Sequence, residues 1–254
     1  RLIAAENAFL VYKLMATLFG AKYTEVPAKN FTHDLAAMAD AITDDTRLVF
    51  IANPNNPTGT MVDQAALDAF IERVPEHVVV CLDEAYFEFL DTPPDTLKYV
   101  REGRNVCVLR TCSKIHGLAG LRIGYGLAAK PVAAIIQKAR QPFNASAIAQ
   151  AGALAALEDD AHVEKTRQIN RDGLAFWQAA LTDRKLTFIP SHANFIMVHV
   201  RDGDRVFQRM LRHGVIVRSL KSYQLPEWIR ISVGTAGQNQ RALRALDLVL
   251  HEEV

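Results

Sequence analysis

The sequence has few cysteines, no long apolar run and no excess of charge of either sign. Its three cysteines, Cys81, Cys107 and Cys112, form no Cys-x-x-Cys pair and are an odd number, which predicts a reducing, cytoplasmic location and no metal site. No apolar run approaches the roughly 18 residues of a membrane-spanning helix, and no signal peptide is visible. We therefore expect no membrane association.

The charge balance excludes further classes of protein. Lys and Arg number 29 against 28 Asp and Glu, so the net charge is +1, which argues against a nucleic-acid binder. The 13 glycines and 10 prolines are too few for a collagen-like or low-complexity chain. Neither a Gly-x-Gly-x-x-Gly motif nor a P-loop is present, so no dinucleotide or nucleoside triphosphate is implied. The remaining class is a globular protein of 254 residues, with one large domain or a large and a small one.

Strand-like and helical segments alternate along the first half of the chain, which is typical of an α/β fold with a mainly parallel sheet. The strands predicted there are residues 23–26, 47–52, 78–82, 105–109 and 122–128. Ala-rich helices and a long helix over 161–182 follow, and then shorter strands at 187–189, 195–200, 215–218 and 228–233. We expect a large domain over residues 1–164 and a smaller α+β domain over 165–254 that includes the long bridging helix.

The first of three polar strand ends is Asn53-Pro-Asn-Asn-Pro-Thr-Gly59, after the strand 47–52. A residue before proline avoids the α region, so the two Asn-Pro steps hold an extended, turning backbone. Asn56 is thereby held with an amide that can donate to an oxygen of a ligand. Because Asn, Pro and Gly dominate turns in general, a plain turn is the more common explanation of such a motif taken alone.

The second strand end is Asp83-Glu-Ala-Tyr86, after the apolar run 78–82. A carboxylate at the end of an apolar strand is costly to bury unless a cation or a donor meets it. One interpretation makes Asp83 an ordinary helix N-cap. The other pairs Asp83 with a protonated ring nitrogen and lets Tyr86 reach an oxygen on the same ring.

The third strand end is Thr111-Cys-Ser-Lys114, with Arg122 eight residues after the lysine. A lysine beside a strand end can be desolvated, which lowers its pKa and suits Schiff-base formation. Thr111, Ser113 and Arg122 supply two hydroxyls and a guanidinium, a set suited to phosphate. Taken alone, Lys114 is more often a surface lysine.

The three strand ends together describe one ligand, because ligands of parallel α/β sheets bind at the carboxyl ends of the strands. The ligand needs a carbonyl for Lys114, a protonated ring nitrogen for Asp83, a ring oxygen for Tyr86 and Asn56, and a phosphate. Pyridoxal 5′-phosphate (PLP) has all four.

The combination of NPNNPTG, DEAY, and TCSK with an arginine eight residues later resembles the fold-type-I PLP-dependent aminotransferases over essentially the whole chain. Within that family the sequence is most similar to the histidinol-phosphate aminotransferases, in the stretches ENAFLVYKLMATLFGA, SHANFIMV, GVIVRSL and YQLPEWIRISVGT. The resemblance implies a fold-type-I PLP-dependent transferase, with a mainly parallel sheet in the large domain and a smaller α+β domain. It also implies a homodimer that uses a small-molecule amino donor, L-histidinol phosphate, and a 2-oxo acid, 2-oxoglutarate.

The resemblance assigns roles to individual residues. Lys114 forms the covalent link to the cofactor and shuttles the proton, while Asp83 keeps the pyridine nitrogen protonated. The other implied cofactor contacts are Asn56 and Tyr86 at the ring hydroxyl, Thr111, Ser113 and Arg122 at the phosphate, and Phe9 stacked on the ring. The implied substrate contacts are Asn194, Arg230 and Arg241. Considered alone, Phe9 is a core residue of a helix and Arg230 a surface arginine.

The sequence departs from the family in two places. Ser219-Leu-Lys-Ser-Tyr-Gln224 stands where the family carries a Pro-x-x-Gly-Tyr-Gly-like loop, and we expect its bulkier, charged residues to alter substrate access. Family members also carry about a hundred residues before the position of Arg1, on the scale of a small domain. That segment holds a glycine-rich turn for the cofactor phosphate, an arm and a substrate-binding tyrosine, so we expect a chain that lacks it.

Several alternatives stay open. Within the enzymes, they are an aromatic or broad-range aminotransferase and a threonine-phosphate decarboxylase-like enzyme. From other classes, they are a PLP-sensing module and an inactive aminotransferase-like fragment kept for oligomerisation.

Overall fold

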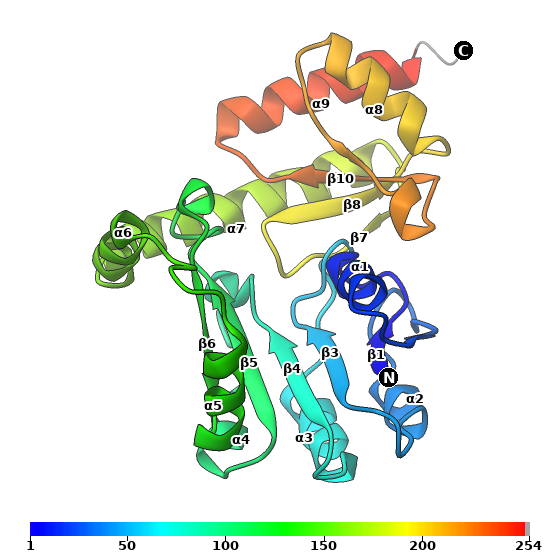
Figure 1. The fold of residues 1–254 in the computed structure, drawn as a ribbon. Coiled ribbons are helices and arrows are strands. Elements are labelled where there is room, and N and C mark those ends of the chain that lie inside the picture. The colour runs from blue at the N-terminus through cyan, green and yellow to red at the C-terminus, as the bar shows by residue number, and fades with distance from the viewer. Residues whose placement is uncertain (252–254) are drawn as a thin grey trace.

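The computed structural model describes residues 1–251 and shows two sheets, each with its own hydrophobic core (Figure 1). The larger sheet has the strand order β2-β1-β3-β4-β5-β6. Its strands are β1 (Leu2–Ala5), β2 (Tyr23–Val26), β3 (Leu48–Ala52), β4 (Val79–Asp83), β5 (Val106–Thr111) and β6 (Gly124–Ala128). All neighbouring strands pair in parallel except β5 and β6, which are antiparallel.

Helices cover both faces of this sheet, so its strands carry apolar residues in both registers. Val49 and Leu82 face a core shared with α2, α3 and α4, whereas Phe50 and Cys81 face the side covered by α1 and α5. These helices are α1 (Val11–Leu18), α2 (Leu35–Asp40), α3 (Gln64–Arg73), α4 (Leu97–Arg101) and α5 (Lys130–Ala139). Burial on both faces explains the unbroken apolar runs of β3 and β4.

The smaller sheet is antiparallel, with the order β7-β8-β10-β9. Its strands are β7 (Phe188–Ile189), β8 (Phe195–His199), β9 (Arg218–Ser219) and β10 (Trp228–Ser232). The remaining helices are α6 (Ala147–Leu157), α7 (Asp160–Asp183), α8 (Gly203–Arg212) and α9 (Ala236–His251). α7 contacts the short 3-10 turn Phe87–Phe89 of the large domain and then β8 and α9, and Trp177 of α7 is fully buried in the small core. The expected boundary between residues 164 and 165 therefore lies inside α7.

The predicted central strands are present within one or two residues. Of the predicted strand 215–218, Arg218 alone lies in β9, which pairs with β10 in the part of the chain that the structure describes. β1 and α4 were not predicted, because periodicity is a weak signal over four and five residues; the equally short β2 was predicted at residues 23–26. Over residues 1–251, no helix combines the length and apolarity needed to span a bilayer.

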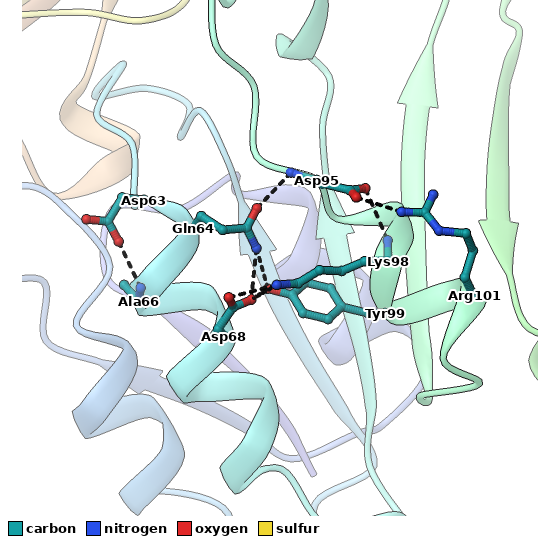
Figure 2. Close-up of polar contacts among 8 residues, drawn as sticks. All are labelled: Asp63, Gln64, Ala66, Asp68, Asp95, Lys98, Tyr99 and Arg101. Atoms are coloured by element: carbon teal, nitrogen blue, oxygen red, sulfur yellow. Dashed lines mark hydrogen bonds and ion pairs between the residues drawn. The ribbon is translucent and has the colours of Figure 1, made fainter.

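A polar cluster joins α3 to α4 on the large domain (Figure 2). The Asp68 carboxylate accepts hydrogen bonds from Tyr99 Oη at 2.5 Å, Gln64 Nε2 at 2.8 Å and Lys98 Nζ at 2.7 Å. The Lys98 ammonium, followed by the Tyr99 hydroxyl, lowers the pKa of Asp68 to about 2. The cluster holds α4, which leads into β5 and hence toward Lys114.

We expect Asp68→Asn to lower the free energy of unfolding at pH 7 by about 1 kcal/mol. This is less than for a buried charged hydrogen bond, because a side chain that is 36% exposed is screened by solvent. The pKa of Asp68 is lower folded than unfolded, so its contribution is present above about pH 5 and is lost as the pH falls toward 2. Urea unfolding between pH 7 and pH 2.5 measures it.

The control for this variant is Asp44→Asn, which changes an exposed aspartate outside the cluster. A stability difference between Asp68→Asn and the wild type that stays constant with pH would contradict the role given to the Asp68 carboxylate.

Candidate active site

The carboxyl ends of β3, β4 and β5 lie side by side, because these strands are parallel and in register (Figure 1). Asp83 pairs with Ala52 on one side and with Leu109 on the other. Asn53 N donates to Asp83 O at 2.9 Å, so the strand pairing continues into the polar motifs. The three motifs therefore border the same space.

A cavity of about 310 Å³ opens at this edge of the sheet. It is lined by all the predicted cofactor residues and by a few small apolar ones. The lining residues are Phe9, Ala52, Pro54, Asn56, Asp83, Ala85, Tyr86, Thr111, Ser113, Lys114, Ala119 and Arg122. The structure thus brings together every residue predicted to bind a cofactor, and their contact with one stays a prediction.

Two asparagines of the first motif hold the loop, and the third lines the cavity. The Asn53 side chain donates to Val62 O at 3.0 Å and accepts from Val62 N at 2.9 Å. Asn55 donates to Asn7 O at 3.1 Å, and both Asn-Pro peptide bonds are cis. Since Asn53 and Asn55 shape the loop, Asn56 is the asparagine of the motif that lines the cavity.

Asp83 is the central anion of the cavity. Its Oδ1 accepts from Ala85 N at 3.2 Å, and its Oδ2 accepts from Tyr12 Oη at 2.6 Å. Burial raises the pKa of Asp83, and these donors and the Lys114 ammonium counteract the rise. Sequence reasoning missed Tyr12, although it follows Phe9 by three residues and so lies near the same face of the helix start.

Lys114 is half-buried, with Nζ 5.2 Å from the centre of the Tyr86 ring. Burial lowers the pKa of Lys114, and the neighbouring cations Arg230 and Arg122 lower it further, while Asp83 opposes them. A depressed pKa leaves more of the lysine as the neutral amine, which is the nucleophilic form.

Two hydroxyls and a guanidinium also line the cavity. Thr111 Oγ1 accepts from Ser113 N at 3.1 Å. Arg122 has a left-handed backbone, with φ of 53°, and its Nη1 donates to Ala119 O at 2.6 Å and to Ser113 Oγ at 3.5 Å. This geometry presents two hydroxyls and a positive charge together, which suits an anion.

The small domain contributes Arg230, from β10. Its Nη1 donates to Asn56 Oδ1, and its guanidinium carbon lies 4.7 Å from the centre of the Phe195 ring. Phe195 in turn meets the edge of Tyr86, with ring centroids 5.2 Å apart. Arg230 and Phe195 therefore connect the small domain to two cavity residues of the large one, Asn56 and Tyr86.

An open groove of about 950 Å³ adjoins the site at Arg230, between α8, β9 and the turn that follows β9. Arg218 lines this groove and is the register partner of Arg230. Directly opposite residues of an antiparallel pair point to the same face, so the two guanidinium groups share one side of the sheet. Sequence reasoning did not select Arg218; its place in the strand-like GVIVR segment was the available signal.

The residues that replace the family's loop also lie at this groove. Ser219 Oγ donates to Asp204 Oδ1, and Lys221 Nζ lies 3.1 Å from Asp204 Oδ2. The turn is thus tied to α8.

Two predicted substrate residues do not line the cavity or the groove. Asn194 precedes β8, and its carbonyl accepts from Val233 N at 2.9 Å. Arg241 lies on α9 with its guanidinium beside Gly214. Their roles in substrate binding stay predictions.

Residues 2–246 match the family model described as aminotransferase class I and II. The histidinol-phosphate aminotransferase of Akkermansia muciniphila is 56% identical over 249 residues, which are 98% of this chain and 69% of that protein. The histidinol-phosphate aminotransferase of Moorella thermoacetica is 46% identical over 253 residues, 98% of this chain and 66% of that protein. The chain spans about two thirds of the length of these curated relatives.

A solved structure agrees with these matches. The crystal structure of histidinol-phosphate aminotransferase from Sinorhizobium meliloti in complex with pyridoxal 5′-phosphate has a TM-score of 0.92 at 28% identity. The match covers 100% of this chain and 71% of that one.

Proposed function

The chain belongs to the aminotransferase class I and II family, and on that basis we propose that it transfers the amino group of L-histidinol phosphate to 2-oxoglutarate. Curated relatives of 56% and 46% identity carry the name of this enzyme, which supports the choice of substrate. The observation that carries the proposal is the convergence of Lys114, Asp83 and Arg122 on one cavity that an arginine-bearing groove adjoins.

The cofactor is pyridoxal 5′-phosphate, and the donor set of the cavity fits it. A buried carboxylate, Asp83, suits a protonated ring nitrogen, while Ser113, Thr111 and Arg122 suit the phosphate. When bound, PLP supplies an aldehyde that accepts the amino group and a protonated ring that withdraws electrons. Both groups of residues line the same cavity.

The protein's own residues have distinct tasks in this reaction. Lys114 Nζ holds the aldehyde carbon of the cofactor and moves the proton at the substrate carbon that bears nitrogen, as base and then as acid. Its lowered pKa favours the neutral amine, which is the form that bonds to the aldehyde carbon and that accepts the proton; having accepted it, the amine can return it as an acid. Asp83, as an anion, keeps the ring nitrogen protonated, and Asn56 and Tyr86 orient the ring oxygen. Phe9 covers a face of the ring.

The acidic end of each substrate meets arginine. Arg230 and Arg218 share a face of the small sheet at the mouth of the groove. Guanidinium groups bind phosphate and carboxylate alike, so one pair serves histidinol phosphate in one half-reaction and 2-oxoglutarate in the other.

The proposed assembly is a homodimer in the cytoplasm. α1 begins two residues after Phe9, and its Leu14 and Leu18 are exposed together with Phe19, which follows the helix and is 79% exposed. Exposed large apolar side chains that gather on one element are typical of an interface. The three cysteines are free and buried, in keeping with a reducing compartment.

Oligomeric state is tested by sedimentation of the wild type and of Leu18→Lys/Phe19→Lys. We expect a dimer for the wild type and a monomer for the variant, because two desolvated charges prevent burial of the α1 face. Leu248→Lys, at an exposed leucine of α9, is the control and stays dimeric. A monomeric wild type would reject the homodimer.

The proposed activity is tested with Lys114→Ala. Wild type mixed with PLP should develop a visible absorption band that changes on addition of histidinol phosphate, and turnover should follow with 2-oxoglutarate. Lys114→Ala should lack the covalent band, and its turnover should fall by several orders of magnitude. Lys138→Ala, on the exposed face of α5, should retain both.

A donor panel of histidinol phosphate, phenylalanine and threonine phosphate decides the substrate class. A preference for phenylalanine, or release of carbon dioxide from threonine phosphate, would reject the proposed substrate. A wild type without a band would instead support an inactive module.

The acidic-end assignment is tested with Arg218→Gln. We expect kcat/KM for histidinol phosphate to fall roughly tenfold to a hundredfold, since a charge-assisted bond to phosphate is lost. The value for histidinol, which lacks the phosphate, should change little. Arg212→Gln, an exposed arginine of α8, is the matched control. Equal losses for both amines would show that Arg218 does not bind the phosphate.

A further inference from the structure

Tyr12 does not line the cavity, yet it bonds to the central carboxylate of the cavity. Its hydroxyl donates to Asp83 Oδ2 at 2.6 Å, and only 5% of the residue is exposed. The Tyr12 ring stacks on Phe50 of β3, with centroids 4.4 Å apart and planes 18° apart. Packing between α1 and β3 therefore aims the hydroxyl at Asp83.

The hydrogen bond from Tyr12 counteracts the effect of burial on the pKa of Asp83. Desolvation raises the pKa of this carboxyl, and Tyr12 provides the strongest opposing contact, ahead of Ala85 N–H and Lys114. Tyr12 keeps its own proton, because burial and the adjacent Asp83 raise the pKa of its phenol well above the usual value. The phenol is therefore a donor at every working pH.

The other titratable groups that face Asp83 do not replace this donor. They are Cys81, Glu84, Tyr86 and Lys114. Burial raises the pKa of the Cys81 thiol and of the Tyr86 phenol to about 12, so both stay neutral. Glu84 is held by Arg110 at 2.8 Å. Lys114 acts on Asp83 by charge alone.

We propose that Tyr12 is a positioning residue, which keeps Asp83 ionised and oriented toward the ring nitrogen of the cofactor. The reference to the ring nitrogen rests on the proposed function; the hold on Asp83 does not. Tyr12 also meets Phe9 edge to face, with ring centroids 5.8 Å apart. The start of α1 thereby sets both the residue that covers the ring and the carboxylate that pairs with it.

Tyr12→Phe removes only the hydroxyl, and the first measurement uses the protein without PLP. Loss of the donor raises the folded pKa of Asp83 further above its unfolded value. The variant is therefore less stable than the wild type by an amount that is small at pH 4 and grows as Asp83 ionises toward pH 8. Urea unfolding at a series of pH values measures this difference.

The matched control is Tyr23→Phe, which removes a hydroxyl from the same apolar cluster without touching Asp83. Its stability difference from the wild type should not vary with pH over this range. In an Asp83→Asn background, the pH-dependent part of the Tyr12→Phe effect should vanish, because the group that titrates is gone. If the hydroxyl had only a structural role, the effect of Tyr12→Phe on the free energy of unfolding would be the same in the Asp83→Asn background as in the wild type.

The second measurement is PLP affinity by absorbance titration at pH 6, 7 and 8. Tyr12→Phe should bind PLP roughly tenfold more weakly at pH 7, with a larger loss at pH 6, where more of its Asp83 is protonated. The proposal would be overturned if stability and PLP affinity varied with pH in the same way for Tyr12→Phe and Tyr23→Phe. If the wild type does not bind PLP, the proposed function fails, and the profile without PLP still decides the role of Tyr12.

Discussion

The buried carboxylate of Asp83 is the constraint around which the site is arranged. An ionised carboxylate at the end of a central strand loses much of its hydration, and it is kept there only by donors and a cation. Tyr12, Ala85 N–H and Lys114 supply these from three different segments. Each of those segments must therefore be correctly placed for the anion to persist, which links the packing of α1 to the chemistry of the lysine.

The pKa of Lys114 is set by the same two influences, burial and neighbouring charges, but burial lowers the pKa of a lysine. Burial, Arg230 and Arg122 disfavour its charged form, while Asp83 favours it. The lowered pKa of Lys114 raises the fraction of neutral amine, while the hydrogen-bond donors and the positive charge around Asp83 oppose protonation of its carboxylate.

The cavity also depends on contacts between the two domains. The guanidinium of Arg230 in the small domain holds the amide of Asn56 in the large one. Gly59, with φ of 76°, lets the Asn-Pro loop approach Ser191 so closely that any Cβ would collide with it. The adjacent His192 N donates to Gly59 O at 2.8 Å. The small domain thus holds the loop that presents Asn56 at two points, Asn56 and Gly59.

The sequence by itself determined the central strands, the three polar strand ends and the ligand they imply, because period, composition and motif chemistry are local properties. It did not show β1 and α4, whose few residues give only a weak pattern, or that the strand predicted at 215–218 would be Arg218–Ser219. Tyr12 and Arg218 became visible only in three dimensions. A tyrosine in a helix and an arginine on a short edge strand are ordinary until packing and strand register place them beside Asp83 and Arg230. Tyr12 and Asp83 are 71 positions apart in the chain, and only the tertiary fold decides which residues so far apart come into contact.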